Sequence, residues 1–274
     1  MPLQPRSVPI TDSVYQSQFD LDIVISMYNE EPASVVEMLT DLKALPIIQR
    51  RSTRIFIYYK GASDLTFNLE HHLENTRLIH RPNIGREGET YLYHILSRRD
   101  NLATHTLFLQ AHVHNPWEMH RRIDQYFVPS TGMLSLGFSG YTCDCGNCFD
   151  RWRWREDRFQ SLYADVYNTT CSTALLSYKG QFIASAQRLR GIDATVYQRL
   201  HDALVDPESW AHTEPYLQGR PDEMSAPLFG FTLERLWSVL LQCSELDIAL
   251  KCPTNLSGKR IEGDVSDCQC LDPT

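Results

Sequence analysis

The stretch that decides the fold is Ile79–Pro116, which contains Ile84-Gly85-Arg86-Glu87-Gly88, then Glu89-Thr-Tyr-Leu-Tyr-His-Ile-Leu96, then Thr106-Leu-Phe-Leu109 and finally Gln110-Ala-His112-Val-His114-Asn115-Pro116. It predicts a strand, a glycine-containing turn, an amphipathic helix and a second strand that ends in polar residues. Ligands of α/β enzymes bind at the carboxyl ends of such strands. The sequence therefore indicates an enzyme with its site near His112 and His114.

The composition is that of an ordinary globular protein, with 274 residues, 42% hydrophobic and 22% charged, and a formal net charge of −8. The acidic balance argues against general coating of nucleic acid. No apolar run approaches the about 20 residues of a membrane helix, and the first residues lack the apolar core of a signal peptide. We therefore expect a cytoplasmic protein with no membrane or stable protein partner. The triplets Asn168-Thr-Thr170 and Asn255-Leu-Ser257 are then chance matches to a glycosylation motif.

Eight cysteines are present, and in a reducing compartment they are expected to be thiols or metal ligands. Cys143, Cys145 and Cys148 lie within six residues, and Cys171 offers a fourth sulfur. Tetrahedral zinc takes four such ligands. These cysteines predict a structural zinc site, with packed thiols as the alternative.

Strands and helices alternate over the first ~130 residues, which favours parallel βαβ units. The ranges 21–28, 54–59, 77–80 and 106–110 are predicted strands, and helical spacing follows the first of them. We expect a Rossmann-type α/β fold with a mixed, mostly parallel sheet flanked by helices and an elaborated C-terminal half. The expected organisation is a loose arm over 1–19, one catalytic domain over 20–245 and an irregular tail over 246–274. Residues 174–178 and 180–185 predict a strand with a tight turn.

The opening Asp22-Ile-Val-Ile-Ser-Met-Tyr-Asn-Glu-Glu31 resembles the first strand and loop of GT-A-type glycosyltransferases. In that family the strand ending in Tyr-Asn-Glu meets the nucleotide, and the fourth strand ends in a metal-binding Asp-x-Asp. This chain has Gln110-Ala-His112-Val-His114 at the corresponding place. The resemblance therefore implies a GT-A-like core with altered chemistry at the metal position.

Four further motifs carry a closer resemblance: Gly85-Arg-Glu-Gly-Glu-Thr-Tyr-Leu92, Phe108-Leu-Gln-Ala-His-Val-His114, Cys143-Asp-Cys-Gly-Asn-Cys148 and Phe229-Gly-Phe-Thr-Leu-Glu-Arg-Leu-Trp237. Together they resemble a fungal family formerly of unknown function, which is similar to the arginine-containing cyclodipeptide synthases. Those enzymes take aminoacyl groups from charged tRNAs and close a diketopiperazine. Their Asp-Asp-x-x-Glu motif is missing here, because the chain contains no Asp-Asp pair.

The predicted catalytic residues are His112, His114 and Glu234. Two histidines at i and i+2 of an extended segment point to one face, which suits a base with its partner or a metal pair; packing of a strand end is the alternative. Glu234 lies on the polar side of a late predicted helix, where GT-A-type enzymes often place a base. An ion pair with Arg235 is the alternative for Glu234.

The predicted substrate-binding residues follow strands or turns: Tyr28, Asn29, Glu30, Lys60, Arg86, Glu87 and Asp222. The glycine turn before a helix offers backbone N–H groups and the Arg86 guanidinium to an anion. Glu30 is a candidate partner for a guanidinium, and it equally suits capping of the next helix. For Arg86 and Glu87 the alternative is a tight turn with a surface ion pair.

Arginines and tryptophans alternate in Arg151-Trp-Arg153-Trp-Arg155. Cations beside aromatic rings suit phosphate contact and base stacking, so these arginines are the predicted tRNA-binding residues. If the segment is a strand, the tryptophans share a face, and two buried rings under a solvated edge are the alternative.

The function expected from these patterns is an aminoacyl-tRNA-dependent synthase that forms a cyclo-Arg-Xaa diketopiperazine in fungal secondary metabolism. Its partners would be arginyl-tRNA and a second aminoacyl-tRNA, and it would need no cofactor beyond the structural zinc. The alternative is a GT-A-type glycosyltransferase that uses a nucleotide sugar. A third possibility is a catalytically inactive binding protein on the same fold.

Overall fold

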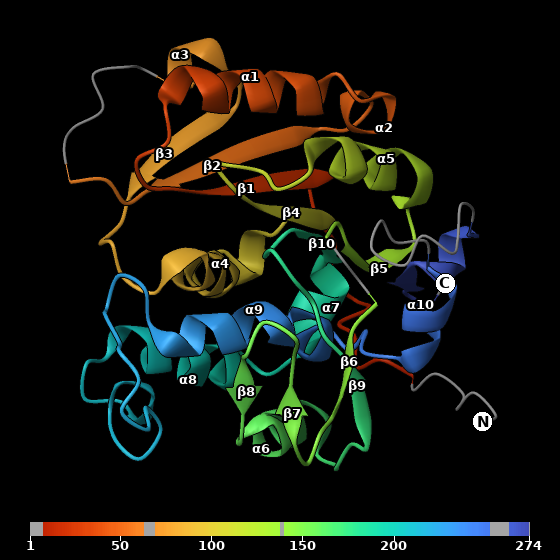
Figure 1. Cartoon of the computed structure of the whole chain (residues 1–274). Coiled ribbons are helices and arrows are strands. Elements are labelled where there is room, and N and C mark those ends of the chain that lie inside the picture. The colour runs from red at the N-terminus through yellow and green to blue at the C-terminus, as the bar shows by residue number, and fades with distance from the viewer. Residues whose placement is uncertain (1–7, 63–68, 138–139, 253–262, 274) are drawn as a thin grey trace.

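The computed structural model describes residues 8–62, 69–137, 140–252 and 263–273. Seven strands form the main sheet (Figure 1): β1 (Leu21–Met27), β2 (Thr53–Tyr59), β3 (Thr76–His80), β4 (His105–Gln110), β5 (Thr131–Ser135), β10 (Phe182–Ser185) and β11 (Gln269–Leu271). Their order across the sheet is β11-β5-β10-β4-β1-β2-β3. Strands β1 to β4 pair in parallel, whereas β10 pairs antiparallel with β4 and β5, and β11 pairs antiparallel with β5. The mixed, mostly parallel sheet predicted from the sequence is confirmed.

Helices cover both faces of this sheet (Figure 1). One face carries α1 (Pro32–Lys43), α2 (Pro46–Gln49), α3 (Leu69–His72) and α5 (Pro116–Tyr126). The other carries α4 (Arg86–Ser97), α7 (Ala186–Gly191), α8 (Ala194–Val205) and α9 (Leu228–Leu240). Below these lie α6 (Phe159–Tyr167) and two small sheets, which pair β6 (Thr142–Asp144) with β9 (Thr173–Leu175) and β7 (Cys148–Phe149) with β8 (Arg155–Glu156). This lower layer is one part of the elaborated C-terminal half.

Aromatic side chains join the middle of the sheet to α4 and α9. The rings of Phe108 on β4 and Phe182 on β10 lie 4.8 Å apart, and the Trp237 ring of α9 lies 5.0 Å from Phe182. Tyr91 of α4 lies 5.0 Å from Phe108. All four side chains are fully buried, and burying such large rings is strongly stabilising. This cluster therefore fixes two helices and two strands relative to one another.

The parallel register brings three strand ends to one edge of the sheet. Met27 of β1 lies opposite Tyr59 of β2, and Ser26 lies opposite Gln110 of β4. Because β10 runs in the opposite direction, the residues that precede it reach the same edge, and the Gln110 side chain donates to the Lys179 carbonyl at 3.4 Å. This edge is where the sequence analysis placed the site.

Both predicted ends of the chain differ from the expected irregular segments. Residues 8–19 contain no helix or strand, but they are anchored, since the Ile10 backbone exchanges two hydrogen bonds with the Gln242 side chain and Asp12 pairs with Arg190 at 2.8 Å. The tail contains α10 (Leu246–Lys251) and supplies β11 to the main sheet. The strand with a tight turn predicted over 174–185 is instead two strands in different sheets. β9 pairs with β6, whereas β10 belongs to the main sheet.

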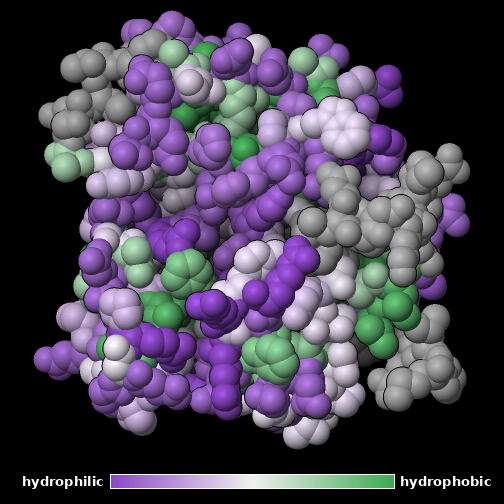
Figure 2. All heavy atoms as spheres, viewed as in Figure 1, coloured by the Kyte–Doolittle hydropathy of each residue, from purple (hydrophilic) through white to green (hydrophobic). Residues whose placement is uncertain are grey.

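The surface is mainly hydrophilic on the face shown in Figure 2, where apolar residues gather only in small groups. Among the described helices none is long and apolar enough to cross a membrane.

All eight cysteines are paired in disulfides. The pairs are Cys143–Cys148, Cys145–Cys171, Cys243–Cys270 and Cys252–Cys268. The expectation of free thiols is therefore corrected. Short-range spacing suggested metal ligands, but the fold brings cysteines together from segments that are up to 27 residues apart, which spacing alone does not reveal.

Candidate functional site

A pocket of about 510 Å³ opens at the carboxyl end of β4, beside the start of α4 and the middle of α9. Five of the predicted site residues line it, namely Arg86, Glu87, His114, Arg151 and Glu234. The residues that complete its wall are Gln110, Asn115, Glu118, Trp152, Tyr178, Lys179, Phe231 and Arg235. We call this the β4 pocket.

Two carboxylates in the β4 pocket have different environments. Glu234 Oε1 accepts the backbone N–H of Lys179 at 2.5 Å, and its Oε2 lies 3.4 Å from the Arg235 guanidinium. Glu87 is buried, and burial raises the pKa of its carboxyl above the usual range, with the Glu234 charge acting in the same direction. A buried carboxyl with a raised pKa suits the role of an acid, and a carboxylate that a backbone N–H holds in place suits the role of a base.

His114 faces the pocket with its backbone held on both sides. Its N–H donates to Gln181 Oε1 at 2.7 Å, and its carbonyl accepts from Gln181 Nε2 at 3.2 Å. Burial, followed by the charge of Lys179, lowers the pKa of the imidazole. A neutral imidazole is able to accept a proton near neutral pH. His112 does not line the pocket, but its ring centroid lies 5.9 Å from that of His114.

A wall of aromatic rings and cations faces these groups. The Trp152 ring lies 4.9 Å from the Tyr178 ring. Arg235 is held by a 2.7 Å ion pair with the buried Asp150, so its position is fixed. Arg86 lies over the Phe231 ring at 4.7 Å. Trp152, Tyr178 and Phe231 were missed by the sequence analysis as pocket residues, because nothing in their local sequence shows that the fold brings them together.

Lys60 and Asp222 are structural instead of substrate-binding. Lys60 is buried, its ammonium pairs with Glu89 at 2.7 Å, and it donates to the carbonyls of Ile84 and Arg86. It therefore holds the glycine turn before α4. Asp222 accepts the backbone N–H of Leu228 at the start of α9 and lies 2.6 Å from the His212 ring. Both side chains are occupied within the protein.

Tyr28, Asn29 and Glu30 lie at the end of β1 but do not line the β4 pocket. Glu30 accepts the backbone N–H of Tyr28 at 2.7 Å, so it closes its own loop and does not cap α1. Tyr28 is exposed. The sequence predicted that these residues follow β1, and the structure places them there, outside the lining of the β4 pocket.

The predicted tRNA-binding arginines lie in different places. Arg151 lines the β4 pocket, Arg155 lines a second pocket of about 430 Å³, and Arg153 lines neither. The tryptophans between them also differ, since Trp152 is exposed and Trp154 is buried with its indole N–H donating to Thr232. The segment is not one continuous strand, because only Arg155 and Glu156 form β8. The condition for a shared face, one continuous strand over residues 151–155, is therefore not met.

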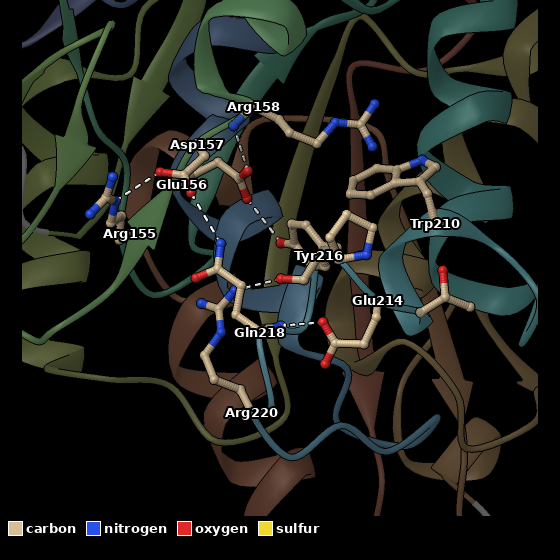
Figure 3. Close-up of a pocket in the computed structure, with 11 residues that line it drawn as sticks. Arg155, Glu156, Asp157, Arg158, Trp210, Glu214, Tyr216, Gln218 and Arg220 are labelled. Atoms are coloured by element: carbon tan, nitrogen blue, oxygen red, sulfur yellow. Dashed lines mark hydrogen bonds and ion pairs between the residues drawn. The ribbon is translucent and has the colours of Figure 1, made fainter.

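Figure 3 shows the second pocket, in which most polar groups already have partners. Arg155 pairs with Asp157 at 2.7 Å, and the buried Glu156 accepts from the Tyr216 hydroxyl at 2.9 Å. Arg158 stacks over Trp210 at 3.7 Å. Three arginines are balanced by three carboxylates in this lining, so it offers no net charge to a polyanion.

The cysteines predicted to bind zinc are brought together, but as the disulfides Cys143–Cys148 and Cys145–Cys171. Zinc binds thiolates, and a disulfide sulfur is not a thiolate. A further grouping of Cys243, Glu245 and Cys270 also contains a disulfide. In these pairings the cysteines therefore cross-link loops and do not form the predicted zinc site.

Comparisons with known proteins identify no family for this chain. No protein-family model matches the chain, and no curated protein matches it. Among solved structures, a 4-diphosphocytidyl-2C-methyl-D-erythritol synthase is similar with a TM-score of 0.33 and 11% identity, over 68% of this chain and 86% of that one. The β4 pocket is therefore the basis for a proposed function.

Proposed function

We propose that this chain is a transferase that moves a glycosyl group from a nucleotide sugar to an acceptor bound in the β4 pocket. The observation that carries the proposal is the arrangement of Glu234, His114 and Lys179 around one cavity at the end of β4. A group transfer needs a base for the incoming nucleophile and positive charge for the leaving group. The pocket offers both.

Lys179 and Arg86 are suited to the leaving diphosphate. The Lys179 ammonium has no carboxylate partner in the part of the chain that the structure describes. Arg86 Nε has a long contact of 3.6 Å with Glu87 Oε2, so its guanidinium is incompletely paired. Fixed cations stabilise developing negative charge where a metal is not used. This role would explain how a chain without Asp-x-Asp neutralises a diphosphate.

Glu234 and His114 are suited to activate the acceptor. The backbone N–H of Lys179 fixes the position of the Glu234 carboxylate. An ionised carboxylate or a neutral imidazole can take the proton of an acceptor hydroxyl as the new bond forms. Glu87, with its raised pKa, is suited to hold a proton nearby.

The disulfides support glycosyl transfer over chemistry on tRNA. Disulfides form and persist in oxidising compartments, whereas charged tRNAs are made and used where thiols stay reduced. Pairing of all eight cysteines is thus easier to reconcile with the glycosyltransferase alternative than with the cyclodipeptide synthase. This proposal accordingly replaces the expectation of a cytoplasmic location with an oxidising compartment.

The test is a thermal-shift screen of nucleoside diphosphates, with and without manganese, followed by turnover assays with the matching nucleotide sugars. A ligand present at 100 times its Kd stabilises the fold by about 2.7 kcal/mol. Lys179→Met should abolish the shift, and Glu234→Gln should retain it while lowering kcat by about 10²–10⁴-fold. Glu37→Gln, on the exposed side of α1, is the matched control and should change neither. No shift with any nucleotide in the folded protein would contradict the proposal.

The second candidate remains the cyclo-Arg-Xaa synthase, and one observation favours it. Three glutamates, Glu87, Glu118 and Glu234, share the pocket with aromatic rings, and carboxylates with ring faces are the groups that recognise a guanidinium. Arg151 in the same lining offers a contact for an anionic tRNA end. Expression in yeast followed by mass spectrometry would reveal new arginine-containing diketopiperazines. His114→Ala and Glu234→Ala should remove such a product.

A further inference from the structure

The triplet Asn168-Thr169-Thr170 lies at the carboxyl end of α6, with all three residues exposed. Asn168 caps the helix in the left-handed region, at φ 51°, and its backbone N–H donates to the Ala164 carbonyl at 2.8 Å. Its side-chain amide makes no hydrogen bond to any residue that the structure describes. An exposed Asn-x-Thr without proline at its centre is an acceptor motif for N-linked glycans.

A second, independent observation concerns the compartment in which this motif would be read. The four disulfides join residues that are 5, 26, 27 and 16 positions apart, so they close loops throughout the C-terminal half. One of them holds Cys171, three residues after Asn168. Disulfides form in the oxidising lumen of the secretory route, which is also where N-linked glycans are attached.

From these two observations we propose that Asn168 is an N-glycosylation site and that the chain folds in an oxidising, glycosylating compartment. The donor is an oligosaccharide linked to a polyprenyl diphosphate. The Asn168 amide nitrogen forms a bond to the anomeric carbon as the bond from that carbon to the diphosphate oxygen breaks. The amide nitrogen loses one proton, and the polyprenyl diphosphate leaves with the electron pair. The Thr170 hydroxyl is the recognition element of the motif.

The folded structure accommodates a glycan at this position. Figure 1 shows α6 at the end of the molecule opposite α1. None of the three residues of the triplet lines the β4 pocket or the second pocket. A branched, hydrated sugar at Asn168 would therefore leave both pockets open. The inference does not rest on the glycosyltransferase proposal, because occupancy of the site is measured without any enzymatic assay.

The test is expression of the full chain behind a secretory leader in yeast, with an Asn255→Gln background that removes the second triplet, which lies outside the described residues. Whole-cell extract and medium are treated with a glycan-releasing amidase that hydrolyses the amide bond between the sugar and asparagine, and the mass of the chain is compared before and after treatment. We expect the chain to be heavier than its sequence mass by the mass of a glycan. The enzyme should remove this excess and leave aspartate at position 168. Reading the cell extract makes the result independent of secretion.

Three variants locate the site. Asn168→Gln and Thr170→Ala should each lose the whole mass shift, whereas Thr169→Ala, the matched control, should keep it. A shift that persists in Asn168→Gln or Thr170→Ala, or no shift in the parent chain, would overturn the assignment. Alkylation of the denatured parent chain should label eight thiols only after reduction. Labelling before reduction would overturn the argument from the disulfides.

Discussion

Glu89 shows how one buried carboxylate organises its surroundings. It pairs with Lys60 at 2.7 Å and with Arg81 at 2.5 Å, and His201 lies 3.6 Å away. Burial raises the pKa of this carboxyl, but the neighbouring His201 and the Lys60 and Arg81 cations outweigh burial and hold the pKa at about 2, below its usual 4.5. The ionised form is therefore stabilised by folding.

We predict that this group makes stability depend on pH in the acid range. Because the folded-state pKa is depressed, its contribution is fully present above about pH 4.5 and is lost as the pH falls through about 2. At 1.36 kcal/mol for each pKa unit, the contribution is about 3 kcal/mol. Urea unfolding of the wild type at several pH values measures it.

Glu89→Gln should remove that pH dependence and lower stability at neutral pH by about 3–5 kcal/mol, since it leaves the Lys60 charge buried without its partner. The exposed Glu37 of α1 offers the matched control, and Glu37→Gln should change little. Equal acid sensitivity in Glu89→Gln and the wild type would show that other carboxylates dominate.

The imidazole of His114 leads to a prediction about activity. Burial lowers the pKa of the imidazole below its usual 6.5, so the neutral, proton-accepting form persists into mildly acidic solution. If His114 is the base, the acid limb of kcat/KM should have its midpoint below 6.5 and should disappear in His114→Gln. His112→Gln, which alters the neighbouring ring outside the pocket lining, should keep the limb. An acid limb unchanged in His114→Gln would assign the proton transfer to another group.

At the scale of elements, the contact between α4 and α9 decides where Glu234 lies. A Cβ at Gly88 of α4 would lie 2.7 Å from Leu233 Cδ2, directly before Glu234 in the chain, and 3.4 Å from Leu204 Cδ1. Gly88→Ala should therefore push the helices apart and cost about 1–3 kcal/mol, despite the better helix propensity of alanine.

The same substitution should lower kcat by moving Glu234, and Gly88→Ala/Leu233→Val should recover part of both losses. A double-mutant cycle on urea unfolding and turnover measures the coupling. Additive effects of the two substitutions would show that the helices do not meet at this contact.

The sequence predicted elements better than it predicted directions of side chains. The strands around residues 21–28 and 106–110 are long, apolar and bounded by polar residues, so the hydrophobic pattern was enough to predict them as buried strands. Lys60 and Asp222 also follow apolar segments, but only packing shows that one turns inward to Glu89 and the other to the α9 terminus. Lys179 and Tyr178 enter the pocket because β10 runs antiparallel, and local sequence contains no sign of that pairing.

Across the complete fold, the disulfide Cys243–Cys270 attaches the tail to the body, and Cys252–Cys268 closes a loop within the tail. Cys243–Cys270 spans 27 residues and fixes β11, whereas Cys143–Cys148 spans 5. On loop-closure entropy, removing the first should cost about 3.5 kcal/mol and removing the second about 2 kcal/mol. Urea unfolding of Cys243→Ser/Cys270→Ser and Cys143→Ser/Cys148→Ser compares them. Equal losses would contradict the dependence on loop length.

The place of β11 in the sheet has a consequence for how copies of the chain behave toward one another. It covers the backbone of β5 from Thr131 to Leu134. If reduction of Cys243–Cys270 releases β11, β5 becomes an exposed sheet edge whose N–H and C=O groups have no partner, and such edges pair with strands from other molecules. By pairing with β5, β11 prevents this edge from pairing with another copy of the chain. Reductant should turn a dispersed preparation turbid well before the rest of the fold melts.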